Sequence, residues 1–158
     1  MKPRVYVETS IPSFYFEKRS EPEMSARRLW TREWWATASD RYDLVTSVAV
    51  LNELKRGDFA ARADSMRLLD GLQLLATDPP VVEIAEAYVA QHVMPKDPLG
   101  DALHLALASF HKCDFLVTWN CAHLANANKF GHIRRINTIL GIHVPSLVTP
   151  LELIGEDE

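Results

Sequence analysis

Residues 97–118 read DPLGDALHLALASFHKCDFLVT, a stretch in which an Ala- and Leu-rich helix leads into an apolar strand. Asp97 and Pro98 predict an N-cap followed by proline at the first helical position, with the helix running to about His111. Apolar and small side chains occupy nearly every face of this helix, which predicts deep burial. Residues 115–118 then form a continuous apolar run, typical of a strand covered by helices on both faces. The stretch therefore predicts an α/β fold with a buried, parallel sheet.

The same alternation of strands and helices extends along the rest of the chain. Further strands are expected at 4–8, 42–46, 72–76 and 146–148, and further helices at 22–38, 48–56, 58–69, 79–92 and 131–140, with a capping box at 149–152. The segment 9–12 is expected to interrupt regular structure, because proline at its end disfavours continuation. Five strands separated by helices predict a single domain over residues 1–158, a three-layer sandwich around a mostly parallel five-stranded sheet.

Composition limits the class of protein. The chain has 158 residues, of which 47% are hydrophobic and 24% charged, as in an ordinary globular domain. No apolar run approaches the roughly 20 residues of a membrane span, and the first ten residues lack the apolar stretch of a signal peptide. A cytoplasmic location with no membrane contact is therefore expected. The formal net charge of −4 excludes a dedicated, strongly basic nucleic-acid binder, so any contact with nucleic acid should come from a local patch.

Three carboxylates and one amide stand where such sheets bind ligands, near the carboxyl ends of the strands. Glu8 ends the first strand, Glu53 lies in the helix after the second, Asp101 lies in the helix before the fourth, and Asn120 follows the fourth. Each carboxylate alone has a simple explanation: a turn cap at Glu8, a solvated side chain at Glu53, and a helix-dipole partner at Asp101. A carboxylate at the inner end of an apolar strand is nevertheless costly to bury unless a cation or hydrogen bonds compensate it.

Taken together, these segments resemble the PIN-domain nucleases, particularly toxins of the VapC type. The segments are VYVETS at 5–10, SVAVLNEL at 47–54, GDALHLALA at 100–108, CDFLVTWN at 113–120 and HLANAN at 123–128. The resemblance implies a PIN-like fold, with Glu8, Glu53 and Asp101 as ligands of Mg²⁺ or Mn²⁺, and metal-dependent endoribonuclease activity. Carboxylate oxygens are the hard ligands that these cations prefer. A bound ion can activate a water molecule and stabilise charge on the scissile phosphate.

Two departures from that family pattern keep a second interpretation open. Many PIN nucleases carry aspartate where this chain has the longer Glu8, and the fourth acidic position is the neutral Asn120, which offers hydrogen bonds but no charge. Asp97 is an alternative fourth acid, although its place before Pro98 favours an N-cap. The alternative function is a catalytically weak or inactive PIN-like module that binds RNA or a protein. A phosphotransfer or phosphatase domain is disfavoured because it would ordinarily need a nucleophilic aspartate at the end of strand one.

Histidine and cysteine residues offer further candidates. The HKC and CAH segments at 111–113 and 121–123 have zinc-type side chains, but the intervening strand would hold them about 16 Å apart at roughly 3.3 Å per residue. Both cysteines are therefore expected to be reduced packing residues. His104, one helical turn after Asp101, is expected either to orient that carboxylate or to be a core histidine.

Substrate contacts and partners are the last sequence-based expectations. Between Asp114 and Glu152 there is no acidic residue, which predicts that RNA approaches across residues 119–135. The tryptophans at 30, 34 and 35 are expected to pack a long helix. The resemblance implies an antitoxin that covers the acidic cleft, and a homodimer. The expected substrate-binding residues are Thr9, Ser10, Trp119, Lys129, Arg134 and Arg135.

Overall fold

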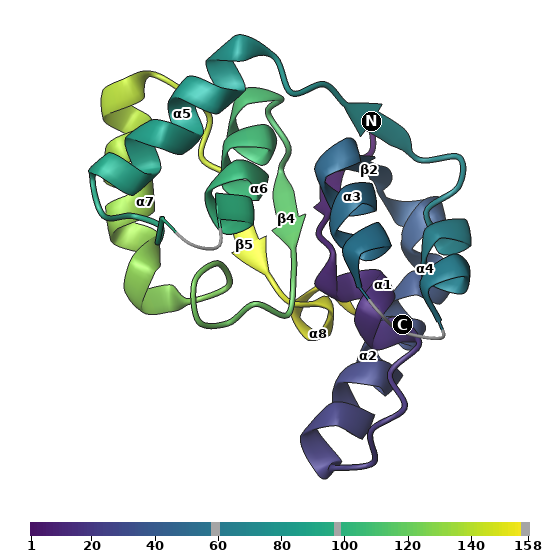
Figure 1. Ribbon diagram of the computed structural model, residues 1–158. Helices are drawn as coiled ribbons and strands as arrows, with labels where there is room; N and C mark the ends of the chain where they lie inside the picture. Colours follow the sequence, from purple (N-terminus) through teal and green to yellow (C-terminus); the bar gives the residue numbers. More distant parts are fainter. Residues whose placement is uncertain (58–60, 97–98, 156–158) are drawn as a thin grey trace.

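A five-stranded, wholly parallel sheet with helices on both faces forms the protein (Figure 1). The computed structural model describes residues 1–57, 61–96 and 99–155. The strand order is β3-β2-β1-β4-β5. The strands are β1 (Arg4–Val7), β2 (Asp43–Ser47), β3 (Gln73–Leu75), β4 (Phe115–Val117) and β5 (Ser146–Val148). The predicted three-layer α/β architecture is confirmed.

The strand order places a topological switch point between β1 and β4. From β1 the chain moves outward to β2 and β3, and it then crosses back to β4 and β5 on the other side of β1. Connections thus leave the two central strands in opposite directions, which opens a crevice beyond their carboxyl ends. This crevice is where the sequence places Glu8 and Asn120.

The helices follow the predicted alternation with two differences. They are α1 (Ser10–Tyr15), α2 (Pro22–Arg41), α3 (Val48–Arg56), α4 (Arg62–Leu68), α5 (Pro79–Ala90), α6 (Leu99–Phe110), α7 (Ala127–Leu140) and α8 (Pro150–Leu153). The first strand ends before residues 9–12 as expected, but the expected lack of regular structure in this segment is wrong. Pro12 lies in the first turn of α1, where a missing N–H costs no helical hydrogen bond. The start of α7 is four residues earlier than expected, since Asn126 caps it by accepting a bond from the Asn128 N–H.

Two other expected caps are confirmed. Ser47 accepts a bond from the backbone of Val50 at the start of α3, and Thr149 and Glu152 form the capping box of α8. The expected cap at Asp97, its alternative role as a fourth acid, and the first three residues of the 58–69 helix all lie outside the described residues.

The core is densest around α6, where eight of twelve residues are buried, as the sequence predicts. Its alanines at 102, 106 and 108 are fully buried, and the helix packs against α5 and β4. Trp34 is fully buried, and Trp30 and Trp35 pack against the core, so this expectation for α2 is confirmed. The amino-terminal half of α2 projects from the body (Figure 1).

Both cysteines are free, but only Cys113 is a packing residue, because Cys121 is exposed. Within the ranges given above, the chain forms no helix that is both long and apolar enough to span a bilayer.

Candidate metal centre

Glu8 lies immediately after β1, at the switch point. Its backbone N–H donates to the Val117 carbonyl, and its side chain is 6% exposed. One carboxylate oxygen, Oε2, accepts three hydrogen bonds: from the Ser10 N–H at 2.9 Å, from the Ser10 hydroxyl, and from the Thr118 hydroxyl at 2.7 Å. These donors come from α1 and from the end of β4, so the two central strands jointly fix this buried carboxylate.

Glu53 reaches the same place from α3. Its Oε2 accepts a bond from the Thr9 hydroxyl at 2.8 Å, and its Oε1 accepts one from His104 Nε2 at 2.6 Å. Burial alone would raise the pKa of this carboxyl group. The hydrogen bond from His104, its charge and the bond from Thr9 outweigh burial, and the pKa of Glu53 is lowered from its ordinary value.

His104 projects from α6 and is 1% exposed. Its Nδ1 shares a 2.7 Å hydrogen bond with the Tyr6 hydroxyl, which in turn lies 2.7 Å from the Ser47 hydroxyl. Burial tends to lower the histidine pKa, but the bond to Glu53 and the surrounding carboxylates raise it overall. Of the two alternatives expected for His104, the core position is confirmed, whereas the orientation of Asp101 is wrong: its two ring nitrogens contact Glu53 and Tyr6 instead.

Glu8, Glu53 and His104 form one group. Each offers a ligand atom, and these atoms all lie within 4.8 Å of one another. Adjacent ligands of an octahedral ion with bonds of about 2.1 Å stand about 3 Å apart, so the spacing is compatible with a shared cation. Two carboxylates and an imidazole also form a donor set suited to a divalent metal. These residues therefore fit a metal centre.

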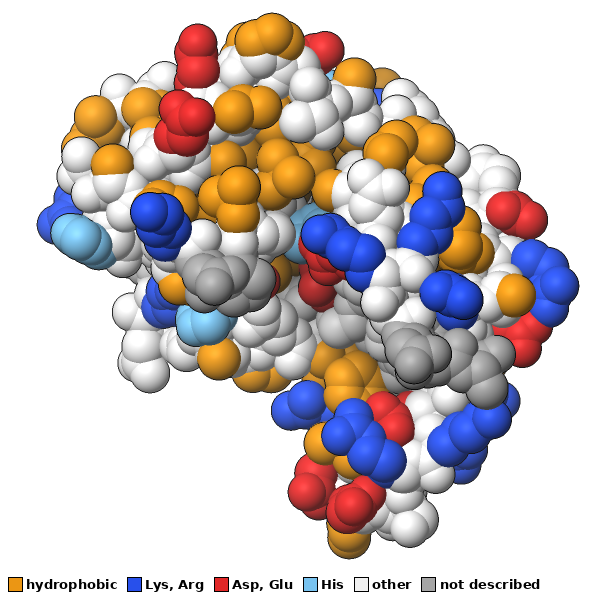
Figure 2. All heavy atoms as spheres, in the orientation of Figure 1, with side chains coloured by type: hydrophobic (Ala, Val, Ile, Leu, Met, Phe, Trp, Pro, Cys, Tyr) orange, Lys and Arg blue, Asp and Glu red, His pale blue; other side chains and the backbone are white. Residues whose placement is uncertain are grey.

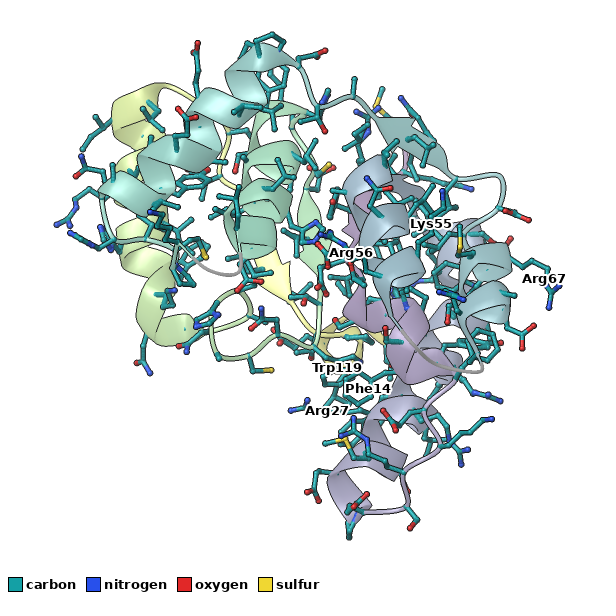
Figure 3. The ribbon with its side chains drawn as sticks, viewed as in Figure 1. Phe14, Arg27, Lys55, Arg56, Arg67 and Trp119 are labelled. Atoms are coloured by element: carbon teal, nitrogen blue, oxygen red, sulfur yellow. The ribbon has the colours of Figure 1, made fainter. Side chains whose placement is uncertain are left out.

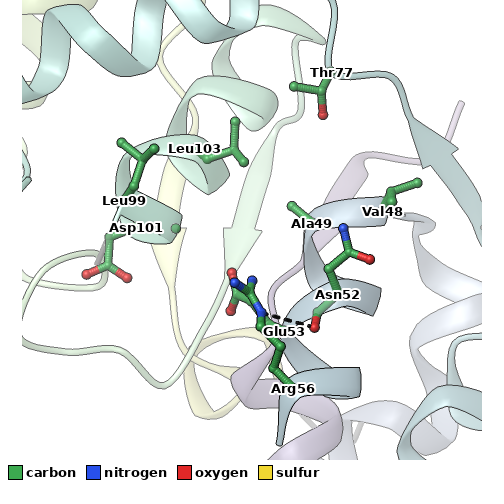
Figure 4. Close-up of a pocket in the computed structure, with 10 residues that line it drawn as sticks. Val48, Ala49, Asn52, Glu53, Arg56, Thr77, Leu99, Asp101 and Leu103 are labelled. Carbon is green, nitrogen blue, oxygen red and sulfur yellow. Dashed lines mark hydrogen bonds between the residues drawn. The ribbon is translucent and has the colours of Figure 1, made fainter. Parts of the chain in front are cut away.

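Asp101 is not a member of that group. It is 8% exposed, and its two oxygens accept bonds from Asn120 Nδ2 at 3.0 Å and from His123 Nδ1 at 2.7 Å. Its carboxylate points away from Glu53 in Figure 4. Asn120 therefore holds Asp101 in place. The role of His123 in this arrangement was not predicted from the sequence, although it lies only three residues after Asn120.

A pocket of about 680 Å³ between α3 and α6 gives access to the site, and both Glu53 and Asp101 line it (Figure 4). Arg56, which the sequence analysis does not assign to substrate, also lines the pocket and is exposed. Its charge contributes to the lowered pKa of Glu53. Lys and Arg side chains gather beside the hollow over α3 and α4 (Figure 2). The pocket thus combines acidic groups inside with cations at its rim.

The residues expected to bind substrate occupy three kinds of position. Thr9 and Ser10 direct their hydroxyls to the two glutamates. Trp119 is 6% exposed and donates from Nε1 to Thr31, with Arg27 and Phe14 against its ring (Figure 3).

The three cations of α7 differ in exposure. Arg134 and Arg135 are exposed, and Lys129 is half-buried. Burial lowers the pKa of Lys129, and the charge of Asp101 partly offsets this effect. Among the three cations of α7, Lys129 is thus the one whose pKa responds to the charge of Asp101.

Replacing Gly100 by alanine should disturb this centre without unfolding the protein. A Cβ at this position would stand 2.8 Å from Glu53 Oε1, so the carboxylate must move away from His104. Loss of ligand orientation should weaken Mn²⁺ binding about tenfold, measured by titration calorimetry. Gly131→Ala in α7 is the matched control, because its Cβ would meet no atom within 4 Å. Equal affinities in the two variants would show that the position of Glu53 does not govern metal binding.

The fold and site define a class of α/β proteins that gather acidic groups at the carboxyl edge of a parallel sheet. A family profile described as PIN domain matches residues 5–121, and the chain belongs to this family. PIN domains are typically metal-dependent nucleases, and the match includes Glu8, Glu53, Asp101 and Asn120. A search of curated proteins found no match.

Proposed function

We propose that this protein is a metal-dependent endoribonuclease that hydrolyses RNA phosphodiester bonds with Mg²⁺ or Mn²⁺. The observation that carries the proposal is the convergence of Glu8, Glu53 and His104 at the switch point of a PIN fold. Glu8 and Glu53 are the proposed direct ligands. Asp101 acts on the ion through water, because its carboxylate lies outside the group of ligand atoms that Glu8, Glu53 and His104 form. Asn120 positions Asp101.

The residues around the centre have separate tasks in this reaction. When bound, the ion lowers the pKa of a water molecule and neutralises charge on the phosphate. Thr9, Ser10 and Thr118 keep the two glutamates in place through their hydroxyls. Arg56, at the pocket rim, offers a guanidinium to the phosphate oxygens of the substrate. Clustered carboxylates would otherwise repel a phosphate, which is why cleavage should require the metal.

Cleavage of labelled single-stranded RNA by the purified protein tests the proposal directly. Mg²⁺ or Mn²⁺ should support cleavage, EDTA should abolish it, and excess metal should restore it. Single-stranded DNA of the same sequence should remain intact if RNA is the substrate. Cleavage that persists in EDTA would contradict the metal requirement.

A non-catalytic RNA- or protein-binding module is the second candidate. The neutral Asn120, at the position of a fourth acid, is the observation that favours it. RNA binding without cleavage in either metal would support this candidate over the nuclease.

We also propose that the protein is a cytoplasmic toxin of the VapC type with a cognate antitoxin. The pocket contains two carboxylates and has room for an inserted side chain, and an Arg fork pairs well with carboxylates. Co-expression with the neighbouring gene product should yield a complex and relieve growth arrest. Sedimentation of the free protein at micromolar concentration should show a homodimer. Failure to co-purify a partner would favour a stand-alone nuclease.

The cations of α7 provide a prediction about RNA binding. Arg134→Ala together with Arg135→Ala should weaken RNA binding across sequences and lower its salt dependence by up to about two phosphate contacts, without changing metal affinity. Fluorescence anisotropy over a series of salt concentrations measures both quantities. Lys2→Ala with Lys112→Ala is the matched control, because these residues lie at the amino ends of β1 and β4, away from the site. If the parent and the Arg134→Ala, Arg135→Ala variant show the same salt dependence of RNA affinity, these two arginines do not contact RNA and are solvated surface residues.

A further inference from the structure

We infer that His104 binds the catalytic ion through Nε2, and that the resulting carboxylate–imidazole centre prefers first-row transition ions, including Mn²⁺, to Mg²⁺. The inference rests on the proposed function for the presence of the ion. It concerns which of this chain's residues hold the ion and which ion they select.

The first observation is the position of the imidazole. His104 Nε2 belongs to the group whose ligand atoms lie within 4.8 Å of one another, and it stands 2.6 Å from Glu53 Oε1. At 1% exposure the ring has a fixed orientation. An ion pair between His104 and Glu53 alone would not require the Glu8 carboxylate to lie within 4.8 Å of both. The hydrogen bonds that Glu8 accepts from described residues all end on Oε2, which leaves its Oε1 available to a cation.

The second observation is the support behind the ring. A histidine that binds metal through Nε2 carries its proton on Nδ1 and donates it to a second group. Here that group is the Tyr6 hydroxyl at 2.7 Å, which can accept this bond while it donates to Ser47 Oγ, also at 2.7 Å. The Tyr6 side chain is fully buried, so water does not compete for these bonds. Tyr6 is therefore a positioning residue for the imidazole.

The choice of metal follows from this donor set. Mg²⁺ is held almost entirely by oxygen ligands, whereas imidazole suits first-row transition ions. Among first-row divalent ions, Mn²⁺ ordinarily has the lowest affinity for a given site. A site that binds Mn²⁺ more tightly than Mg²⁺ therefore gives a stringent test of the nitrogen ligand.

Pulsed electron paramagnetic resonance of the Mn²⁺-loaded protein tests the ligand directly. The parent should show coupling between Mn²⁺ and a bound nitrogen, and ¹⁵N-histidine labelling should change the coupling pattern. His104→Gln should abolish the coupling, and His123→Gln should retain it. Should His104→Gln fail to fold, coupling that persists in labelled His123→Gln still assigns the nitrogen to His104, the described histidine that groups with Glu8 and Glu53.

Calorimetric titration with Mn²⁺ and Mg²⁺ tests the selectivity. His104→Gln should weaken Mn²⁺ binding about 10- to 100-fold and change Mg²⁺ binding much less. Tyr6→Phe should keep the nitrogen coupling but weaken Mn²⁺ binding about tenfold. Tyr88→Phe is the matched control, because this buried tyrosine bonds Ser109 and Asn137 instead.

Three results would overturn the inference: no Mn²⁺ binding, no nitrogen coupling in the parent, or coupling that survives His104→Gln. The proposed function would still stand in each case if Mg²⁺ supports RNA cleavage. Conversely, nitrogen coupling without RNA cleavage would refute the nuclease and leave the metal ligand established.

Discussion

Glu53→Gln should reduce metal-dependent RNA cleavage about 10²- to 10³-fold while the protein stays folded. Metal chemistry supplies several kcal/mol of transition-state stabilisation, and each ~1.4 kcal/mol corresponds to a tenfold change in rate. Glutamine keeps the size of the side chain and its bond with Thr9, but it loses the charge that holds a cation. His104 can release its proton once its partner is neutral, so no unpaired charge remains buried.

Single-turnover cleavage at saturating metal gives the rate for this variant, and circular dichroism confirms the fold. Glu86→Gln, an exposed substitution on α5, removes the same charge far from the pocket and should cleave at the parent rate. Undiminished cleavage by folded Glu53→Gln would remove Glu53 from the metal centre.

Most of the fold could be predicted from the sequence because each strand is a short apolar run bounded by clear breaks. The element boundaries that were predicted wrongly are those where local sequence signals conflict. Pro12 suggested an end to regular structure, yet proline is tolerated in the first turn of a helix. Gly131 suggested a helix start, yet it lies inside α7, whose true cap is Asn126.

The candidate site was less predictable, because side-chain partners depend on how separate elements pack. Strand order places Glu8 and Glu53 together, and this much follows from topology. Spacing along one helix suggested that His104 faces Asp101. In the structure His104 instead bonds to Glu53, which lies on α3. Asp101 accepts its hydrogen bonds from Asn120 and His123, which lie in the loop after β4. Those pairings require knowledge of three neighbouring elements at once.

Trp119→Ala should lower the free energy of unfolding by about 3–5 kcal/mol, the range for large aromatic truncations in a core. The ring stacks on Trp30 at a centroid distance of 6.1 Å and carries Arg27 over its face at 5.2 Å. Its Nε1 also donates to the buried hydroxyl of Thr31 at 2.8 Å. Truncation would leave a cavity beside α2, and the Thr31 hydroxyl would keep only the bond that it donates to the Arg27 carbonyl.

Urea denaturation measures this loss, and Trp119→Phe should lose less because it retains most of the ring packing. RNA binding separates the packing role from the substrate contact that the sequence suggests. Stacking of a base on an aromatic side chain is worth about 1–3 kcal/mol. If Trp119→Ala lowers RNA affinity by that amount but leaves stability within about 0.5 kcal/mol, the side chain is a substrate contact. If Trp119→Ala loses stability but, while still folded, binds RNA like the parent, the indole instead anchors α2 beside the loop that carries Asn120.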